Sequence, residues 1–155
     1  MRLNRLGKIV QEELSKTAVI RSNINIDEFI IMPNHLHSII SITDSTGTAR
    51  HAHTNEKFGR PVQGSIPTII RSFKSAVTKS AHELGLFIKS QIWHRNYYEH
   101  VIRNEEALER IRNYIITNPE NWSRDTDNPD HSGKNLFKVW LDQYNIFKSI
   151  DNPNY

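Results

Sequence analysis

The chain has 155 residues, an apolar fraction of 37% and a formal net charge of +3, which fits a single domain with its own hydrophobic core. It contains no cysteine, so disulfides, thiolate zinc sites and cysteine nucleophiles are excluded. It has neither the roughly 20 apolar residues of a membrane span nor the apolar core of a signal peptide. We therefore expect a cytoplasmic protein without a membrane partner.

The first half of the chain predicts one helix and a pair of strand segments. Apolar residues recur every three or four positions over residues 3–14, which is typical of an amphipathic helix. Residues 25–42 are strand-like in two parts, and a Pro-Asn pair between the parts indicates a turn. Residues 43–63 are polar and lack periodicity, which predicts a loop.

The second half predicts two further helices. One opens near Ser65 or Pro67 and runs to about residue 84. The other has Asn104 as its N-cap and acidic residues in its first turn, and we expect it to end where Pro119 blocks continuation. Elsewhere the pattern predicts one bent strand or two short ones over 87–102, a linker over 121–134 and a small element over 136–147.

Basic charge is concentrated in the middle of the chain. Residues 57–103 carry eight lysines and arginines against two glutamates, a net charge of +6, with aromatic residues nearby. Cations that meet phosphates and flat rings that stack on bases are what a nucleic-acid groove needs. Charge alone fits a solvated surface equally well, so this indication is weak by itself.

The sharpest motif is a His-Leu-His sequence in the second strand segment. Side chains alternate between the faces of a strand, so His35 and His37 project the same way and can share one cation, while Leu36 points into the core. Without cysteine, the remaining ligand types suit Mg²⁺ or Mn²⁺ at least as well as Zn²⁺. The alternative is a pair of surface histidines on a strand. His51 and His53 share the spacing but lie in the polar loop, where we do not expect a metal site.

A second motif ends the last predicted helix. Tyr114 and Asn118 are four residues apart, hence one turn apart on the same face, and Arg110 lies one turn earlier. The apolar stripe of this helix follows other positions, so Tyr114 flanks the core together with an amide and a cation. Considered alone, Tyr114 is also typical of a boundary tyrosine that packs its ring and hydrates its hydroxyl.

Together these motifs resemble those of the single-tyrosine HUH transposases. The segments MPNHLH, FKSAVTK and WHRNYYEHVIRNEEALERIRNYIITNPENW follow one another in the order and spacing of that family, and the resemblance covers roughly residues 3–122. The chain is most similar to the REP-associated tyrosine transposases and their insertion-sequence-200-like relatives. These enzymes cut single-stranded DNA, leave a 5′-phosphotyrosine on the enzyme and a free 3′-hydroxyl, and rejoin strands by the reverse attack.

The resemblance implies a role for each matching residue. His35 and His37 match the metal pair and Asn118 the third metal ligand, with Mg²⁺ or Mn²⁺ as cofactor and no organic cofactor. Tyr114 matches the nucleophile. The expected partner is single-stranded DNA folded as a hairpin, at a REP-like repeat or an element end, bound by a monomer or a homodimer. The basic residues expected to bind this DNA are Arg71, Lys74, Arg95, Arg103 and Arg110.

The resemblance also implies a ferredoxin-like or RRM-like α+β fold, an antiparallel sheet with helices packed on one face. Residues 1–122 would form the catalytic domain and residues 123–155 a C-terminal linker and tail. Relatives carry a strand before the segment that matches the start of this chain. We therefore expect either a shortened form or a sheet that lacks an N-terminal edge strand, and an exposed sheet edge destabilises a fold or pairs with another chain.

Two other functions explain parts of the pattern. A domesticated or inactive relative would bind structured single-stranded DNA without cleaving it. A plain RRM-like RNA-binding module would account for the basic region, but not for a histidine pair and a Tyr–Asn pair at matching positions. Covalent labelling of the protein by a hairpin oligonucleotide in the presence of Mn²⁺ would separate cleavage from binding alone.

Overall fold

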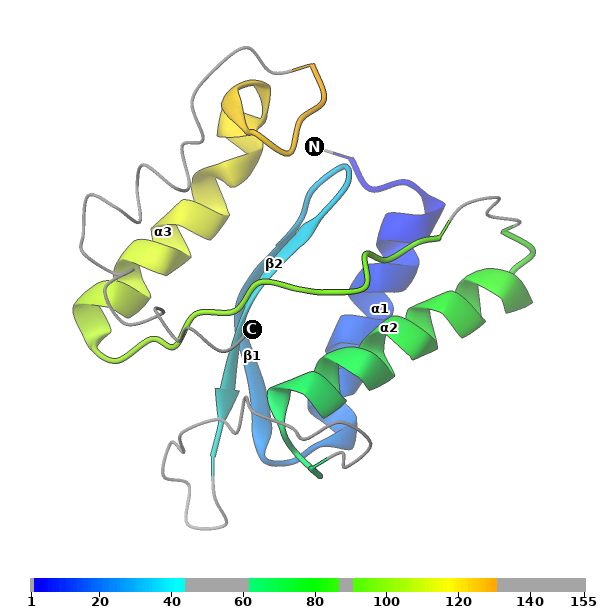
Figure 1. Cartoon of the computed structure of the whole chain (residues 1–155), viewed down its shortest axis with the longest axis horizontal. Helices are drawn as coiled ribbons and strands as arrows, with labels where there is room; N and C mark the ends of the chain where they lie inside the picture. Colours follow the sequence, from blue (N-terminus) through cyan, green and yellow to red (C-terminus); the bar gives the residue numbers. More distant parts are fainter. Residues whose placement is uncertain (1, 44–61, 87–90, 131–155) are drawn as a thin grey trace.

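The computed structural model describes residues 2–43, 62–86 and 91–130, which form an α+β fold (Figure 1). In these parts of the chain the strands make one antiparallel two-stranded sheet. The expected α+β class with an antiparallel sheet is therefore confirmed, and the arrangement is consistent with a ferredoxin-like fold. The elements in chain order are α1 (Arg5–Ile20), β1 (Ile24–Ile31), β2 (Leu36–Ile42), α2 (Ile66–Glu83), α3 (Glu105–Asn121) and the 3₁₀ helix η1 (Trp122–Arg124).

The two strands form a hairpin whose turn leads into the first histidine. The backbone N–H of Met32 donates to the carbonyl of His35 at 2.9 Å, around the Pro-Asn pair that predicted a turn. The pairing register shifts once within β1, so that Asp27 and Glu28 both lie opposite Ile39. This is a β-bulge, one extra residue in β1.

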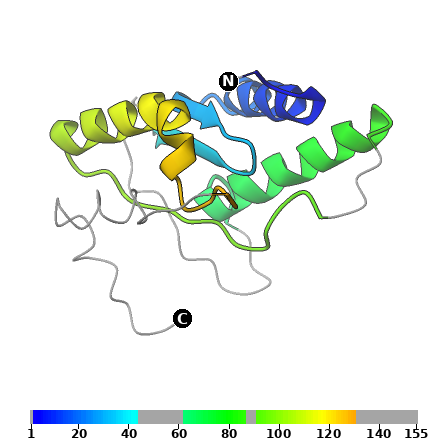
Figure 2. The ribbon, with the colours of Figure 1, turned by 90° about the horizontal axis from the view of Figure 1, so that it is seen from above.

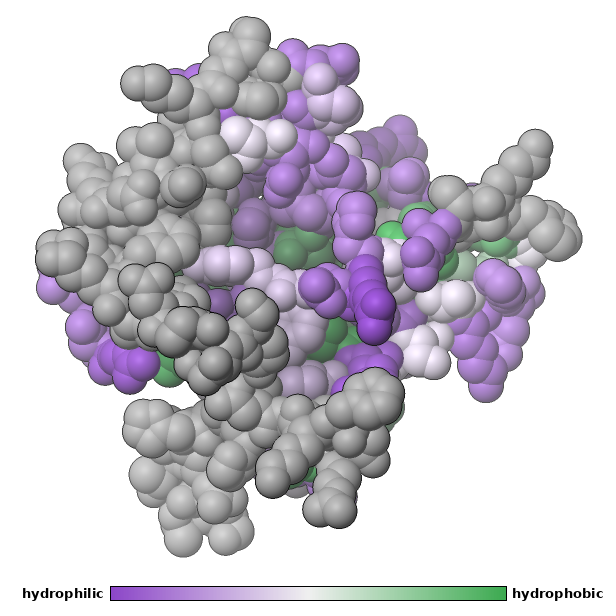
Figure 3. Space-filling model, in the orientation of Figure 1, coloured by the Kyte–Doolittle hydropathy of each residue, from purple (hydrophilic) through white to green (hydrophobic). Residues whose placement is uncertain are grey.

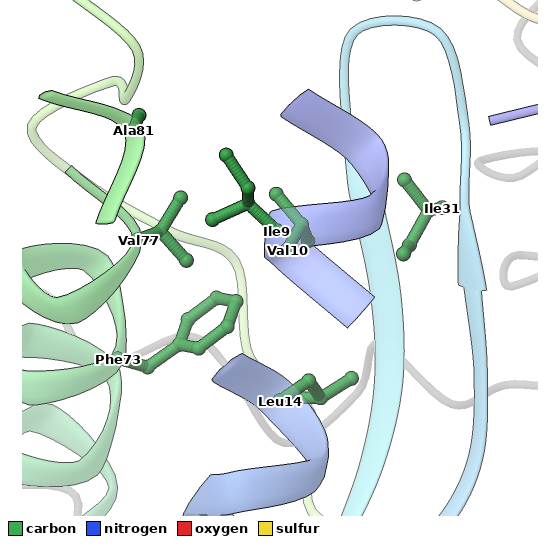
Figure 4. Close-up of a cluster of buried hydrophobic side chains, with 7 residues drawn as sticks. All are labelled: Ile9, Val10, Leu14, Ile31, Phe73, Val77 and Ala81. Atoms are coloured by element: carbon green, nitrogen blue, oxygen red, sulfur yellow. The ribbon is translucent and has the colours of Figure 1, made fainter. Parts of the chain in front are cut away.

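Helices α1 and α2 pack together over one face of the hairpin and enclose the larger core. Apolar side chains of α2 point toward those of α1 and toward β1 (Figure 4). Burying an aliphatic or aromatic side chain of this kind stabilises the folded state by roughly 1.5–3 kcal/mol. This cluster therefore contributes most of the apolar contact that holds α1 and α2 against the sheet. Its fully buried members, none more than 8% exposed, are Ile9, Val10, Leu14, Ile31, Phe73, Val77 and Ala81.

Helix α3 lies on the other side of the hairpin (Figures 1 and 2). Leu36 packs against the core made by α1 and α2, whereas the ring centroid of its neighbour His37 lies 5.4 Å from that of Tyr114 on α3. Adjacent strand residues face opposite ways. The expectation that the helices share one face therefore holds for α1 and α2 and is corrected for α3. Its Arg112 is tied to Asp27 by two hydrogen bonds of 2.7 and 2.6 Å on this second face.

Two helix ends differ from the prediction. The periodic apolar residues predicted an end near residue 14, but α1 continues to Ile20, because Thr17 is also buried and its hydroxyl donates to the carbonyl of Glu13 at 2.8 Å. Helix α3 contains Pro119 and ends at Asn121. A proline this close to the helix end removes a single N–H donor, so the last turn survives it.

Residues 91–103 connect α2 to α3 without the predicted strand (Figure 1). Side chains rather than a strand ladder hold this segment. The Nε1 of Trp93 donates to the carbonyl of Lys74 at 3.1 Å, and the Nζ of Lys74 donates to the carbonyls of His94 and Asn96 at 2.9 and 3.3 Å. Most of the predicted loop, the first part of the predicted strand and the whole predicted element over 136–147 lie outside the described residues.

The coloured part of the surface in Figure 3, which belongs to the described residues, is mostly hydrophilic, and hydrophobic residues show there mainly in the recesses between polar ones. No helix among the described residues combines the length and the apolar character that crossing a membrane requires.

Candidate functional site

Two histidines stand at the beginning of β2. His35 ends the hairpin turn, just before the strand, and His37 is the second strand residue. Their ring centroids are 4.7 Å apart and their planes are inclined at 77°. Residues two apart along a strand project to the same face. The two imidazoles are therefore neighbours on the face that α3 covers.

Helix α3 brings Tyr114 and Asn118 to the same place. The ring of Tyr114 stands edge-on to His37, and a hydrogen bond joins its hydroxyl to the amide of Asn118 one turn later. Asn118 is only 2% exposed, yet its Oδ1 has no hydrogen-bond partner. Leaving a buried acceptor unsatisfied costs about 1–3 kcal/mol, so this oxygen calls for a functional explanation.

Hydrogen bonds around His35 define its neutral form. The Nδ2 of Asn34 donates to the carbonyl of Asp127, which leaves its Oδ1 facing the Nδ1 of His35 at 2.9 Å. Because an amide oxygen only accepts, Nδ1 carries the hydrogen and Nε2 holds the lone pair. This Nε2 is buried and has no hydrogen-bond partner. Imidazoles that bind metals are arranged in this way, with one nitrogen anchored and the other directed at the ion.

The turn after η1 folds back onto the same histidine. The Oδ2 of Asp125 lies 3.8 Å from the Nε2 of His35, and the Oδ2 of Asp127 lies 3.7 Å from its Nδ1. The ring centroid of Trp122 lies 6.0 Å from that of His35. The sequence pattern predicted only a linker here, so it did not identify the two aspartates. The signal that could have indicated them is an Asp-x-Asp pair directly after a helix that carries the tyrosine.

Burial keeps both imidazoles neutral. It lowers the pKa of His35, although Asp125 and Asp127 act in the opposite direction. It also lowers the pKa of His37 to about 4, with the neighbouring His35 adding to the shift. Desolvation disfavours a charged ring, so near pH 7 both histidines are in the form that can bind a cation.

The tyrosine is held in its protonated form. Burial, followed by the charge of Asp125, raises the pKa of Tyr114, while the hydrogen bond from Asn118 acts in the opposite direction. Either Arg110 or a bound metal was expected to favour the phenolate, and the guanidinium of Arg110 pairs with Glu106. The residues around the phenol therefore do not by themselves favour the phenolate.

The donors at this site fit a divalent cation. Within residues 2–43, 62–86 and 91–130 no group of three or more His, Cys, Asp or Glu side chains is arranged to hold a metal ion. The third donor implied by the resemblance is instead an amide, the Oδ1 of Asn118. Two imidazoles and an amide oxygen form a mixed set that Mg²⁺ or Mn²⁺ accepts. A cation here would give partners to two of the buried atoms without hydrogen bonds, the Nε2 of His35 and the Oδ1 of Asn118.

The predicted DNA-binding residues are spread over three parts of the chain. Lys74 holds the connecting segment in place, with its Nζ 6.0 Å from the ring centroid of Trp93 and 5.8 Å from that of Tyr97. Burial lowers the pKa of Lys74. His51 and His53 lie outside the described residues. The other four predicted residues are Arg71 on α2, Arg95 and Arg103 in the connecting segment, and Arg110 on α3.

Comparison with known proteins identifies a relative. No family model matches the chain, and no solved structure matches it. A protein of Haemophilus influenzae named "Uncharacterized protein" is 37% identical over 129 residues, which cover 81% of this chain and 71% of that protein. At this identity and coverage the two chains share a fold and a common origin. The chain therefore belongs to the same protein family as this Haemophilus influenzae protein.

Proposed function

We propose that this protein is a single-tyrosine strand transferase of the HUH type, which cuts and rejoins single-stranded DNA through Tyr114. The observation that supports the proposal is the meeting of a histidine pair from the hairpin with Tyr114 and Asn118 from α3. Two buried atoms in this cluster lack hydrogen-bond partners. Buried polar clusters with shifted pKa values are costly to a fold and concentrate at functional sites.

The proposed reaction is a transesterification at phosphorus. The phenol oxygen of Tyr114 attacks the phosphate and releases its proton to solvent, the bond from phosphorus to the 3′ oxygen breaks, and that oxygen takes up a proton. The products are a 5′-phosphotyrosine and a 3′-hydroxyl, and rejoining reverses every bond change. A divalent cation held by His35, His37 and Asn118 would supply charge stabilisation to the phosphate oxygens and favour the phenolate.

Tyr114 needs activation before it can act as the nucleophile, because burial raises its pKa. A phenol with a pKa above 10 is a poor nucleophile near pH 7. Asn118 contacts the hydroxyl of Tyr114 through its amide group and leaves its Oδ1 for another partner. The same residue can therefore orient the nucleophile and hold the cation that activates it.

An RNA-binding module of the RRM type is not favoured. Such modules stack bases on an open sheet face. Here α1 and α2 cover one face of the hairpin, and α3 places Tyr114 and Arg112 against the other. The basic segment between α2 and α3 still suits a nucleic-acid backbone, which agrees with DNA held beside the site rather than spread over the sheet.

The test is adduct formation with a hairpin oligonucleotide labelled at its 3′ end, incubated with Mn²⁺ and resolved on a denaturing gel. The wild-type protein should carry the label, and Tyr114→Phe should not, although it should bind the oligonucleotide equally well in fluorescence anisotropy. Tyr98→Phe removes a hydroxyl from a 55% exposed ring and serves as the matched control. A Tyr114→Phe protein that still forms the adduct at the wild-type rate would refute the proposal. Binding without any wild-type adduct would support the non-cleaving alternative.

A further inference from the structure

The turn that follows η1 holds one carboxylate in a fixed position beside the histidines. The backbone N–H of Asp125 donates to the carbonyl of Trp122 at 3.1 Å. The Oδ1 of Asp125 accepts a hydrogen bond from the backbone N–H of Asp127 at 2.9 Å. This local turn occupies one carboxylate oxygen, and the other, Oδ2, is the one that lies 3.8 Å from His35. The side chain of Asp125 is 13% exposed, so water does little to neutralise its charge.

Two acceptors therefore face each other across a short gap. The Nδ1 hydrogen of His35 is directed at Asn34, so the Nε2 that faces Asp125 carries a lone pair. A direct hydrogen bond does not explain the contact, because the 3.8 Å separation exceeds the usual donor–acceptor range of about 2.7–3.2 Å. The lone pair on the Nε2 of His35 and the carboxylate oxygen of Asp125 repel each other, and a cation between them would turn this repulsion into attraction.

The gap has the right size for a shared metal ion. Metal-bound nitrogen and oxygen atoms lie roughly 2.0–2.2 Å from the ion, so two ligands of one ion are at most about 4.4 Å apart. The 3.8 Å between His35 and Asp125 lies inside that limit. Independent support comes from Asn118, which is only 2% exposed and presents an oxygen without a hydrogen-bond partner. The charge of Asp125 also acts on His37 and on Tyr114, so its carboxylate lies near the other members of the cluster.

We propose that Asp125 is a fourth protein ligand, which joins His35, His37 and Asn118 around the same divalent cation when the ion binds. Without the ion, the described His and Asp side chains are not yet arranged as a metal-holding group of three, so binding must draw the carboxylate of Asp125 in toward the histidines. This inference rests on the proposed function and extends its metal site from three donors to four. A carboxylate is the donor that hard cations such as Mg²⁺ and Mn²⁺ prefer. It also brings a negative charge that the two imidazoles and the amide do not supply. The turn after the tyrosine helix thus belongs to the metal site.

Asp127 provides a matched control within the same turn. Its carboxylate lies 3.7 Å from the anchored Nδ1 of His35 rather than from the Nε2, and its side chain is 65% exposed. Both aspartates place one negative charge at almost the same distance from the imidazole. A ligand role predicts that only Asp125 matters strongly, whereas a general electrostatic effect predicts similar losses for the two.

The experiment measures Mn²⁺ binding by isothermal titration calorimetry on the wild-type full chain, Asp125→Asn and Asp127→Asn. The expected result is a loss of affinity of at least about tenfold for Asp125→Asn, since losing even a residue that only supports a ligand weakens metal sites by roughly 10–100-fold. The loss for the exposed Asp127→Asn should be much smaller. Unchanged affinity of Asp125→Asn, or equal losses for the two variants, would overturn the inference while leaving the three-donor site intact. A wild-type protein that binds no Mn²⁺ would instead remove the metal site on which the proposed function depends.

Folding of the variants is checked by urea unfolding in EDTA. Asn at position 125 keeps an oxygen that can accept the hydrogen bond from Asp127, so the turn should form without the charge. Asp125→Ser keeps a shorter acceptor at the same place and also lacks the carboxylate. It is titrated in parallel, and a tenfold loss in whichever variant unfolds like the wild type supports the inference, while wild-type affinity in that variant overturns it.

Discussion

Replacing Asn118 by alanine should cost the metal-free protein almost no stability, although Asn118 is among its most buried polar residues. The reason is that its Oδ1 is buried at 2% residue exposure without a hydrogen-bond partner. Asn128 is a natural comparison, because it is also buried, at 9% exposure. Its Nδ2 donates to the carbonyl of Trp122 and its Oδ1 accepts from the backbone of Asp130, both at 3.0 Å.

The expected magnitudes follow from these contacts. Asn118→Ala removes an unsatisfied acceptor, a gain of about 1–3 kcal/mol, and loses one hydrogen bond to Tyr114, worth about 0.5–1.5 kcal/mol. Alanine is also the better helix former by up to about 0.7 kcal/mol, and this gain offsets part of the packing that is lost. The two hydrogen-bond terms sum to between a loss of about 0.5 kcal/mol and a gain of about 2.5 kcal/mol, so no substantial net loss of stability is expected. Asn128→Ala loses two satisfied hydrogen bonds and gains nothing, so it should lose about 1–3 kcal/mol.

The assay is urea unfolding of both variants and the wild-type protein, first in EDTA and then with Mn²⁺. Added Mn²⁺ should stabilise the wild-type protein and the Asn128→Ala variant by mass action, and should stabilise Asn118→Ala much less. A loss of more than about 2 kcal/mol for Asn118→Ala in EDTA would show that Asn118 is retained for folding, and would refute the assignment of its oxygen to a ligand. Equal Mn²⁺ effects on all three proteins would refute it as well.

Three further predictions concern the fold and the DNA. Because Arg112 holds the pKa of Asp27 below its usual range, this carboxylate stabilises the folded state above the unfolded pKa, and the contribution is lost as the pH falls through the folded pKa. Urea unfolding between about pH 6 and pH 2 should therefore show a steeper acid loss, beginning at roughly pH 5, for the wild type than for Asp27→Asn. Gly85 follows α2 with a φ of 70°, and no surrounding atom lies within 4 Å of the position that a β-carbon would take there, so Gly85→Ala should lose about 1–2 kcal/mol from backbone strain alone. Arg71→Ala and Arg103→Ala should each lower the slope of log affinity against log salt by roughly 0.7 per lost phosphate contact, while Arg2→Ala, at an exposed position, should leave it unchanged.

Local rules predicted most of the helices and the hairpin. Asn4, Ser65 and Asn104 accept hydrogen bonds from the first turns of α1, α2 and α3, and capping of this kind can be predicted from a few neighbouring residues. The strand predicted over 87–102 was wrong in its described part, because Trp93 anchors that segment through a tertiary contact with α2. Such a contact leaves no periodic pattern in the sequence.

The site was predictable where its residues are close in the chain. His35 and His37 are two residues apart on a strand, and Tyr114 and Asn118 are four apart on a helix, so each pair follows from the period of its element. The two pairs meet where α3 packs against the hairpin, and the sequence pattern predicted this meeting only through a family resemblance. Asp125 reaches His35 through a turn held by one backbone hydrogen bond and by its own side chain. An Asp-x-Asp pair marks the two carboxylates in the sequence, but it does not indicate which histidine they approach.

The hairpin separates the main apolar core of this protein from its candidate site. One face of the sheet carries the apolar contacts with α1 and α2, and the other carries His37 and Asp27 against α3. The bulge in β1 makes this division possible. Strict alternation from Ile26 onward would turn Glu28 into the core and Phe29 out of it, since a shift of one residue exchanges the two faces. With the extra residue, Ile26 and Phe29 both pack against the core, and Asp27 remains on the side where it holds the helix that carries Tyr114.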